Sequence, residues 1–342
     1  MGEEQDRGTT THDHGAMTAG EATDDPRGSP LAVVLNSSAG MDRRGVEDRV
    51  GAALSEAGVA ASIDVLSPLE LEDRLALLRD SQRGTIAVAG GDGTMLTAAT
   101  LLAGSTTALL PLPTGTLNHF ARRLGLHDLE SAAAAARDGA TAAVPVGIVD
   151  DLTFLNTATF GLYADMVRRR ERLRKLLRKW PAAAVSFAMT LTRLRLMDVT
   201  LIVDGERLER RTSLVWIGVG WGSFPLVHEA PKQVARPDLE IVILKPAGPF
   251  RSLALLLRLS FRVQLGTQPI RDGALEILHA QQLLIHGQHR IGVTLDGEAL
   301  RIEPPVFIAI QDEALRVITP SAEKAATPSG EDLPEGSPGL VS

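Results

Sequence analysis

The sequence predicts an α/β N-terminal doubly wound domain followed by a mainly antiparallel β C-terminal domain. Short β-branched runs alternate with amphipathic stretches from Leu31 to about Ala142, which is typical of a parallel sheet with helices on both faces. After that point, short apolar runs follow one another with few helices between them. We therefore assign residues 30–142 to the first domain and residues 143–319 to the second, whose last strands can return to the first.

In the first domain each predicted strand is followed by a helical pattern. We expect strands at residues 31–35, 61–66, 85–89 and 108–110, with helices at residues 47–57 and 69–79, from Thr94 onward, near residues 118–124, and at residues 129–137. In the second domain we expect strands at residues 143–148, 153–157, 199–203, 213–219, 239–244, 282–285, 291–295, 306–310 and 314–318.

The two ends of the chain are polar. Residues 1–29 are rich in Gly, Thr, Asp and Glu, and residues 320–342 are rich in Pro, Ser, Glu and Gly. Such segments bury too little apolar surface to offset the entropy of ordering, so we expect disordered tails.

Composition excludes several classes of protein. A net charge of −7 argues against a protein that coats nucleic acid, because that task needs a strongly positive surface. The absence of cysteine excludes disulfides, Cys-ligated zinc and thiol nucleophiles. No apolar run approaches the roughly 20 residues that span a bilayer, and the N-terminus has no signal-peptide core, so we expect a cytoplasmic protein. Nothing in the sequence indicates an oligomeric state.

The sharpest motif is Gly90-Gly91-Asp92-Gly93-Thr94, here called the glycine loop, which lies between a predicted strand and a predicted helix. Glycines allow the backbone to approach a ligand closely, and the N–H groups that begin the helix favour phosphate oxygens. We expect Thr94 to be the helix N-cap and Asp92 to hold Mg²⁺ directly or through water. The alternative is an ordinary strand-to-helix turn.

Two further glycine-containing polar loops follow strands of the same sheet. One is Asn36-Ser37-Ser38-Ala39-Gly40, and the other runs from Pro113 through Thr116 to Ala121. The carboxyl ends of strands in an open α/β sheet meet at one edge, where ligands bind. The three loops together predict a phosphate-binding cradle.

A basic segment from Arg168 to Trp180 stands out in this acidic chain. Its leucines and Trp180 recur at helical spacing among many Lys and Arg residues. This pattern is typical of a basic amphipathic helix that lies on an anionic membrane surface. A solvated helix that packs its leucines on the protein is the alternative.

These motifs together resemble those of the diacylglycerol kinase catalytic-domain family, whose members include bacterial diacylglycerol kinases and sphingosine and ceramide kinases. The glycine loop, the loop from Pro113 to Ala121, the Asn36 loop and Asp296-Gly297-Glu298 carry the resemblance, which spans residues 31–318. It implies an ATP-dependent kinase that phosphorylates a hydroxyl of diacylglycerol or a related lipid, with Mg²⁺, at the periphery of a membrane.

The resemblance also implies roles for individual residues. Asp296 would take the proton from the lipid hydroxyl, and Glu298 would support it or the metal; in sphingosine-kinase-like members the aspartate equivalent to Asp92 has the base role instead. The implied ATP contacts are Asn36, Ser67, Gly90, Gly91, Asp92, Gly93, Thr94 and Thr116.

The tripeptide Asp-Gly-Glu occurs twice, at Asp204 and at Asp296. Asp-Gly between apolar strands is also a common hairpin turn. We interpret Asp204 as a plain hairpin residue and Asp296, in the C-terminal context of the family, as the functional one.

Two features leave alternatives open. Where many family members have an Asp-Gly-x-Leu-Asp segment that forms a structural magnesium site, this chain begins the segment with Arg236, which puts that site in question. The glycine loop also occurs in NAD kinases, although their Asn-Glu pair is absent after Asn118 and Asn156. An NAD-kinase-like enzyme and an inactive nucleotide-binding or lipid-binding module remain the alternatives.

Overall fold

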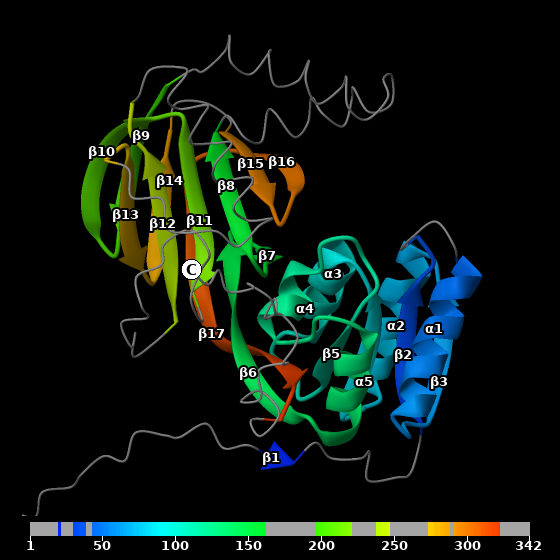
Figure 1. The fold of residues 1–342 in the computed structure, drawn as a ribbon. Helices are drawn as coiled ribbons and strands as arrows, with labels where there is room; N and C mark the ends of the chain where they lie inside the picture. The colour runs from blue at the N-terminus through cyan, green and yellow to red at the C-terminus, as the bar shows by residue number, and fades with distance from the viewer. Residues whose placement is uncertain are drawn as a thin grey trace, which may run out of the picture.

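The computed structural model describes residues 20–21, 30–38, 43–161, 196–220, 237–246, 273–287 and 291–321. They form two lobes, one with helices around a parallel sheet and one built of antiparallel strands (Figure 1). The fold class predicted from the sequence is therefore confirmed. None of the described helices is long and apolar enough to cross a membrane. The basic segment from Arg168 to Trp180 lies outside the described residues.

The first lobe contains the parallel strands β2 (Leu31–Asn36), β3 (Ala61–Leu66), β4 (Thr85–Gly90) and β5 (Ala108–Pro113), in the order β5-β4-β2-β3. β2, β4 and β5 are buried along most of their length, as expected for apolar strands covered on both faces. The helices are α1 (Arg43–Glu56), α2 (Pro68–Asp80), α3 (Asp92–Leu102), α4 (His119–Arg123) and α5 (Leu129–Asp138).

Two long strands connect the lobes. β6 (Ala140–Val149) and β17 (Val306–Thr319) pair antiparallel along most of their length, with an irregularity between Gln311 and Leu315. β17 also runs parallel to β5, so the end of the chain lies beside the first-lobe sheet. Val317 of β17 belongs to the core of the first lobe and Ile308 to the core of the second. The boundary predicted near residue 142 falls inside β6.

The second lobe packs two sheets face to face. β9 (Met197–Val203), β10 (Glu206–Thr212) and β14 (Gln282–His286) extend the long sheet beyond β17, and β7 (Leu152–Phe154) pairs with β6. The second sheet has the order β13-β12-β11-β8-β15-β16, with the bounds β13 (Leu275–Ala280), β12 (Asp238–Leu244), β11 (Leu214–Gly220), β8 (Thr157–Gly161), β15 (Ile291–Leu295) and β16 (Glu298–Ile302).

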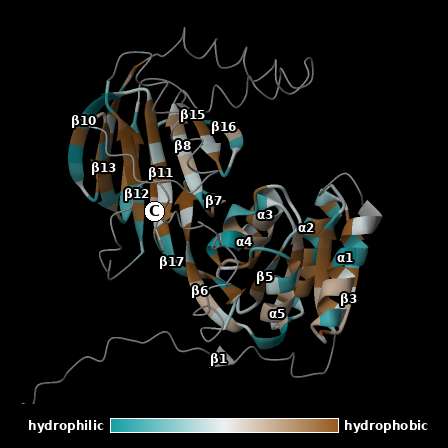
Figure 2. Cartoon of the chain, viewed as in Figure 1, coloured by the Kyte–Doolittle hydropathy of each residue, from teal (hydrophilic) through white to brown (hydrophobic). Residues whose placement is uncertain are grey.

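Several strand predictions need correction. The strand expected at residues 153–157 is two strands, β7 and β8, separated by Leu155 and Asn156. β10, β13 and β16 were not predicted, and the two strands expected at residues 306–310 and 314–318 are the single strand β17. β10 carries hydrophilic residues (Figure 2), which suits an edge strand but hides it from a hydrophobic pattern.

Part of the N-terminal stretch expected to be disordered is paired with the first lobe. Gly20 and Glu21 form the short strand β1 (Gly20–Glu21), which pairs antiparallel with Thr141 and Ala140 of β6. The remainder of residues 1–29 lies outside the described residues.

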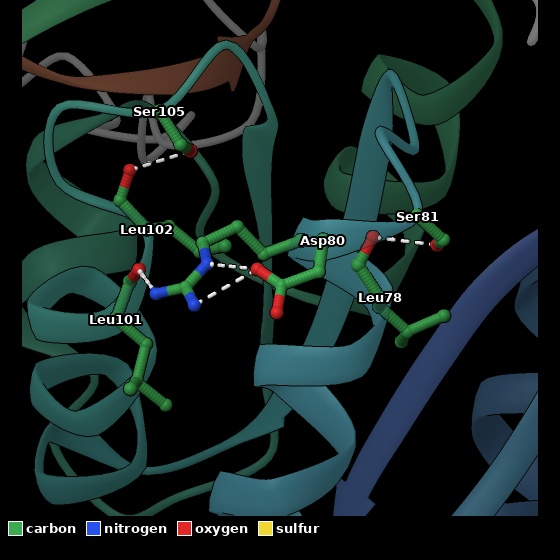
Figure 3. Close-up of polar contacts among 7 residues, drawn as sticks. Leu78, Asp80, Ser81, Leu101, Leu102 and Ser105 are labelled. Carbon is green, nitrogen blue, oxygen red and sulfur yellow. Dashed lines mark hydrogen bonds and ion pairs between the residues drawn. The ribbon is translucent and has the colours of Figure 1, made fainter.

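The carboxyl ends of α2 and α3 are linked by polar contacts (Figure 3). Arg79 of α2 donates from Nη1 to the Leu101 carbonyl of α3 at 3.2 Å. The hydroxyls of Ser81 and Ser105 donate to the Leu78 and Leu102 carbonyls at 2.8 Å and 2.7 Å. These bonds satisfy carbonyls that a helix end leaves without an intrahelical partner.

Glu240 is a buried acid in the middle of β12. Only 7% of the residue is exposed, and Oε1 has no hydrogen-bond partner among the described residues. His279 is its cross-strand neighbour on β13, and Asp238 accepts a 2.9 Å contact from the His279 ring. Burial raises the pKa of Glu240 to about 7, while His279 lowers it and Asp238 raises it.

We predict that Glu240 makes the protein less stable as pH rises. The raised pKa means that the folded state keeps a proton on Glu240 between about pH 4.5 and pH 7 that the unfolded state has lost, so stability falls across this window. The full effect is on the order of 3 kcal/mol. Glu240→Gln should remove this dependence and be more stable than wild type at pH 8 in thermal unfolding. An unchanged pH dependence in the variant would contradict the assignment.

Candidate functional site

The polar loops expected to form the phosphate cradle lie at one edge of the parallel sheet. β2 ends at Asn36, β4 ends at Gly90 and β5 ends at Pro113. The Asn36 amide nitrogen donates a 2.8 Å hydrogen bond to Oγ1 of Thr94, and the Thr114 N–H donates to the Gly90 carbonyl at 3.3 Å. The loop after β4 is therefore bonded to the loops on either side of it.

The loop after β5 contacts the glycine loop at Gly115 and Gly91, where neither loop has a side chain. A Cβ on Gly115 would lie 2.4 Å from the Gly91 Cα and 2.7 Å from Asn118 Oδ1, distances that a real Cβ does not reach. Asn118 closes this loop, since its side chain accepts from the Gly115 N–H and donates to the Gly115 carbonyl. Close backbone approach at this position requires glycine.

Thr94 is not the N-cap that the sequence predicted. α3 begins at Asp92, and its N-cap is Gly91, which offers no side-chain cap. Thr94 is instead buried in the first turn, where its hydroxyl accepts from Asn36. Without a side-chain cap, the N–H groups of this turn suit an anion such as a phosphate oxygen.

Asp92 links α3 to α4. Its Oδ1 accepts a 3.1 Å hydrogen bond from the main-chain N–H of Phe120, in the first turn of α4. Oδ2 has no bond to another described residue. Asp92 therefore holds the start of α4 with one oxygen and presents a second, negatively charged oxygen beside the glycine loop.

Asp296 lies in the turn between β15 and β16, at a positive φ of 44°. Its carboxylate accepts three main-chain hydrogen bonds: from Leu155 N at 2.6 Å, and from Asn156 N and Thr157 N at 2.8 Å each. Its own N–H donates to the Thr157 carbonyl at 2.9 Å. The side chain thus fixes the connection between β7 and β8.

The Asp296-Gly297-Glu298 turn of the second lobe lies close to the glycine loop of the first lobe. Burial raises the pKa of Asp296, the three N–H donors lower it, and the negative charge of Asp92 raises it again. Glu298, exposed at the start of β16, has its Oε1 3.7 Å from the position that a Cβ on Gly93 would take. The structure brings together Asp92, Gly93, Asp296 and Glu298, which lie about 200 residues apart in the sequence.

Ser67 and Thr116 are less closely tied to this group. Ser67 is the N-cap of α2, where it forms a capping box with Glu70. It follows β3, the strand next to β2, at the same edge of the sheet. Thr116 is exposed on the loop between Gly115 and Asn118. Neither side chain has a hydrogen bond to the glycine loop among the described residues.

Arg123, at the end of α4, is a site residue that the sequence analysis missed. Its guanidinium donates to the Leu155 carbonyl at 3.3 Å and to the Val219 carbonyl at 2.7 Å. Burial lowers the pKa of Arg123 to about 10, and the Asp296 carboxylate opposes this effect. Adjacent Arg122 is exposed, and no spacing in the sequence signals which of the two turns inward.

The other Asp-Gly-Glu turn has the same local construction in a different place. Asp204, at a φ of 46°, joins β9 to β10. Its Oδ1 accepts from Gln281 N at 3.0 Å and Gln282 N at 2.9 Å, and its Oδ2 lies 3.2 Å from Gln281 N. Asp204 is therefore more than a plain hairpin residue, because it anchors the chain between β13 and β14.

The donors beside the glycine loop fit a phosphate-bound magnesium ion better than a free one. Asp92 supplies one carboxylate oxygen, and the remaining coordination would come from phosphate oxygens and water, as Mg²⁺ commonly prefers. No group of three or more His, Cys, Asp or Glu residues in the described ranges could hold a metal ion by itself. Arg236 lies outside the described residues, and Asp238 of the same segment contacts His279.

Comparisons with known proteins agree with this geometry. Residues 30–149 match the family model of the diacylglycerol kinase catalytic domain. The crystal structure of a diacylglycerol kinase from Bacillus anthracis str. Sterne has 19% identity and a TM-score of 0.60, with 86% of this chain and 97% of that chain covered. A second structure from that organism, of a protein proposed to be a diacylglycerol kinase, has 21% identity and a TM-score of 0.63, with 86% and 98% covered.

At these identities the likeness to solved structures establishes the fold, and the family model shows a similarity over residues 30–149. The family implies a kinase. Over residues 30–149 this chain is therefore similar to the diacylglycerol kinase catalytic domain family, which the glycine loop and its neighbours also resemble.

Proposed function

We propose that this protein transfers the γ-phosphate of ATP to a hydroxyl of diacylglycerol or a related lipid. The observation that carries the proposal is the approach of the Asp296-Gly297-Glu298 turn to the glycine loop, where Glu298 Oε1 lies 3.7 Å from the place that a Cβ on Gly93 would occupy. A phosphate cradle with acidic groups beside it, one to accept the proton of the hydroxyl and one to hold the metal, is what phosphoryl transfer to a hydroxyl needs.

The residues of the first lobe would bind the nucleotide. The uncapped N–H groups at the start of α3 and the side-chain-free contact between Gly91 and Gly115 leave room for phosphate oxygens close to the backbone. Asn36 steadies the first turn of α3 through Thr94. Ser67 and Thr116 would be further contacts of the nucleotide. Mg²⁺, when bound at Asp92, would offset the negative charge of the phosphates.

Asp296 would accept the proton of the lipid hydroxyl. A carboxylate has about four acceptor positions, and three of those on Asp296 are used by main-chain N–H groups. One remains for the hydroxyl. The raised pKa makes the carboxylate a stronger base than an ordinary aspartate. Glu298 would support Asp296 or the metal.

We further propose that the lipid is met at an anionic membrane surface, through the segment from Arg168 to Trp180. Support for this comes from the sequence, in which Lys and Arg are concentrated around an apolar stripe. An enzyme whose acceptor is dissolved in a membrane needs some surface contact of this kind. This contact would make the protein a cytoplasmic one that associates peripherally with the membrane.

The test of the proposed function is a kinase assay with labelled ATP and Mg²⁺. The acceptors are diacylglycerol, monoacylglycerol, sphingosine, ceramide, phosphatidylglycerol and NAD, with each lipid presented in vesicles with and without anionic lipid. We expect one phosphorylated lipid, formed faster on anionic vesicles. Phosphorylation of NAD alone would favour the NAD-kinase-like alternative, and nucleotide binding without any product would favour an inactive module.

We predict that Asp92→Asn abolishes turnover and leaves the fold intact. The Asn side chain keeps an oxygen that can accept from Phe120 N, so α4 keeps its start, but the negative charge is lost. Turnover of labelled ATP and the melting temperature are the two measurements. Near-wild-type activity with Mg²⁺ would show that the glycine loop does not bind phosphate through this charge.

We predict different outcomes for the two Asp-Gly-Glu turns. Asp296→Asn should lower turnover by roughly 10²–10⁴-fold, because proton acceptance is lost. It should also lower stability by about 1–3 kcal/mol, since the Asn amide nitrogen donates and cannot accept, so at least one buried main-chain N–H of the β7–β8 connection loses its partner.

Asp204→Asn is the matched control. Both Gln281 N and Gln282 N contact Oδ1, which an Asn side chain retains, so activity and melting temperature should stay close to wild type. Activity is measured well below the melting temperature of each variant. An active Asp296→Asn variant beside an inactive, folded Asp204→Asn variant would move the catalytic centre to the other turn.

A further inference from the structure

The two halves of the candidate site are connected through the five residues of α4. At its start, the Phe120 N–H donates to Asp92. At its end, Arg123 donates to Leu155 and Val219 of the second lobe. Asp92 is therefore attached to the start of this short helix, and the backbone segment that donates to Asp296 is attached to its end.

The segment from Leu155 to Thr157 is held on every side by this arrangement. Its three N–H groups donate to Asp296. Its three carbonyls accept from Arg123, from Val219 N at 3.2 Å and from Asp296 N at 2.9 Å. Arg123 also donates to the Val219 carbonyl of β11, so one guanidinium ties the β7–β8 connection to β11.

A cation is well suited to this position. The guanidinium has several donors in a rigid plane, which lets one side chain reach the carbonyls of both Leu155, between β7 and β8, and Val219, in β11. Burying a charge is costly, and the nearby Asp296 carboxylate favours the charged form and offsets part of that cost. A neutral side chain would lose both the second donor and this attraction.

We propose that Arg123 is a positioning residue for the phosphoryl transfer: it fixes residues 155–157, and through them the Asp296 carboxylate, relative to the Asp92 half of the site. The proposal rests on the proposed function for its kinetic consequence. Its structural consequence, the restraint of residues 155–157, is measurable without any activity.

The test compares Arg123→Met and Arg123→Lys with wild type and with Arg79→Met. Arg79 is the matched control, because it also donates to a main-chain carbonyl, Leu101 on a neighbouring helix, and has no hydrogen bond to a residue of the candidate site among the described residues. Two readouts are taken well below the melting temperatures: amide hydrogen exchange of residues 155–157, and steady-state kinetics with the lipid acceptor found in the kinase assay.

In Arg123→Met we expect exchange at residues 155–157 to become roughly tenfold faster or more, because main-chain N–H groups lose protection when their segment opens locally. We expect kcat to fall about 10²-fold, the effect of a misplaced catalytic group, with KM for ATP unchanged. Arg123→Lys should be intermediate in both readouts, and Arg79→Met should change neither.

Retained protection and retained kcat in Arg123→Met would overturn the proposal, as would equal effects in Arg79→Met. Loss of protection with unchanged kcat would also overturn it, since the segment would then be held without consequence for transfer. If wild type phosphorylates no acceptor, the proposed function fails, and hydrogen exchange alone decides whether Arg123 fixes the segment.

Discussion

Three main-chain N–H groups that converge on the Asp296 carboxylate set the geometry on which the candidate site depends. A carboxylate removed from water is costly unless donors surround it, and the β7–β8 connection supplies those donors. The same bonds fix the turn from which Glu298 faces Gly93. The fold and the chemistry therefore use the same atoms, and a change that disturbs one disturbs the other.

The parallel half of the fold could be predicted because its strands are short runs rich in apolar residues that lie between helical patterns. The range predicted for β3, residues 61–66, agrees with the structure. The second lobe was harder. β10 is a charged edge strand, and the turn at Leu155 and Asn156 lies inside an apolar run. That turn is stabilised by Asp296, about 140 residues away, and no local pattern carries this information.

The candidate site could be predicted only where its residues form contiguous motifs. The glycine loop, Asn36 and Asp296 were found because each belongs to a recognisable run of residues. The role of Thr94 was not foreseen, since its partner Asn36 lies on another strand. Arg123 has an identical neighbour in Arg122, and only the packing of α4 against the second lobe decides which side chain turns inward.

The turn at Asp296 is one of three built in the same way among the described residues. Asp150, Asp204 and Asp296 all have a positive φ, and each carboxylate accepts from at least one main-chain N–H group of another segment. Local sequence therefore specifies an anchored turn and not a chemical role. What distinguishes Asp296 is its surroundings, since burial and, to a smaller extent, the charge of Asp92 raise its pKa, and the guanidinium of Arg123 lies close by. A structural anchor becomes a candidate base because the two lobes bring it to the glycine loop.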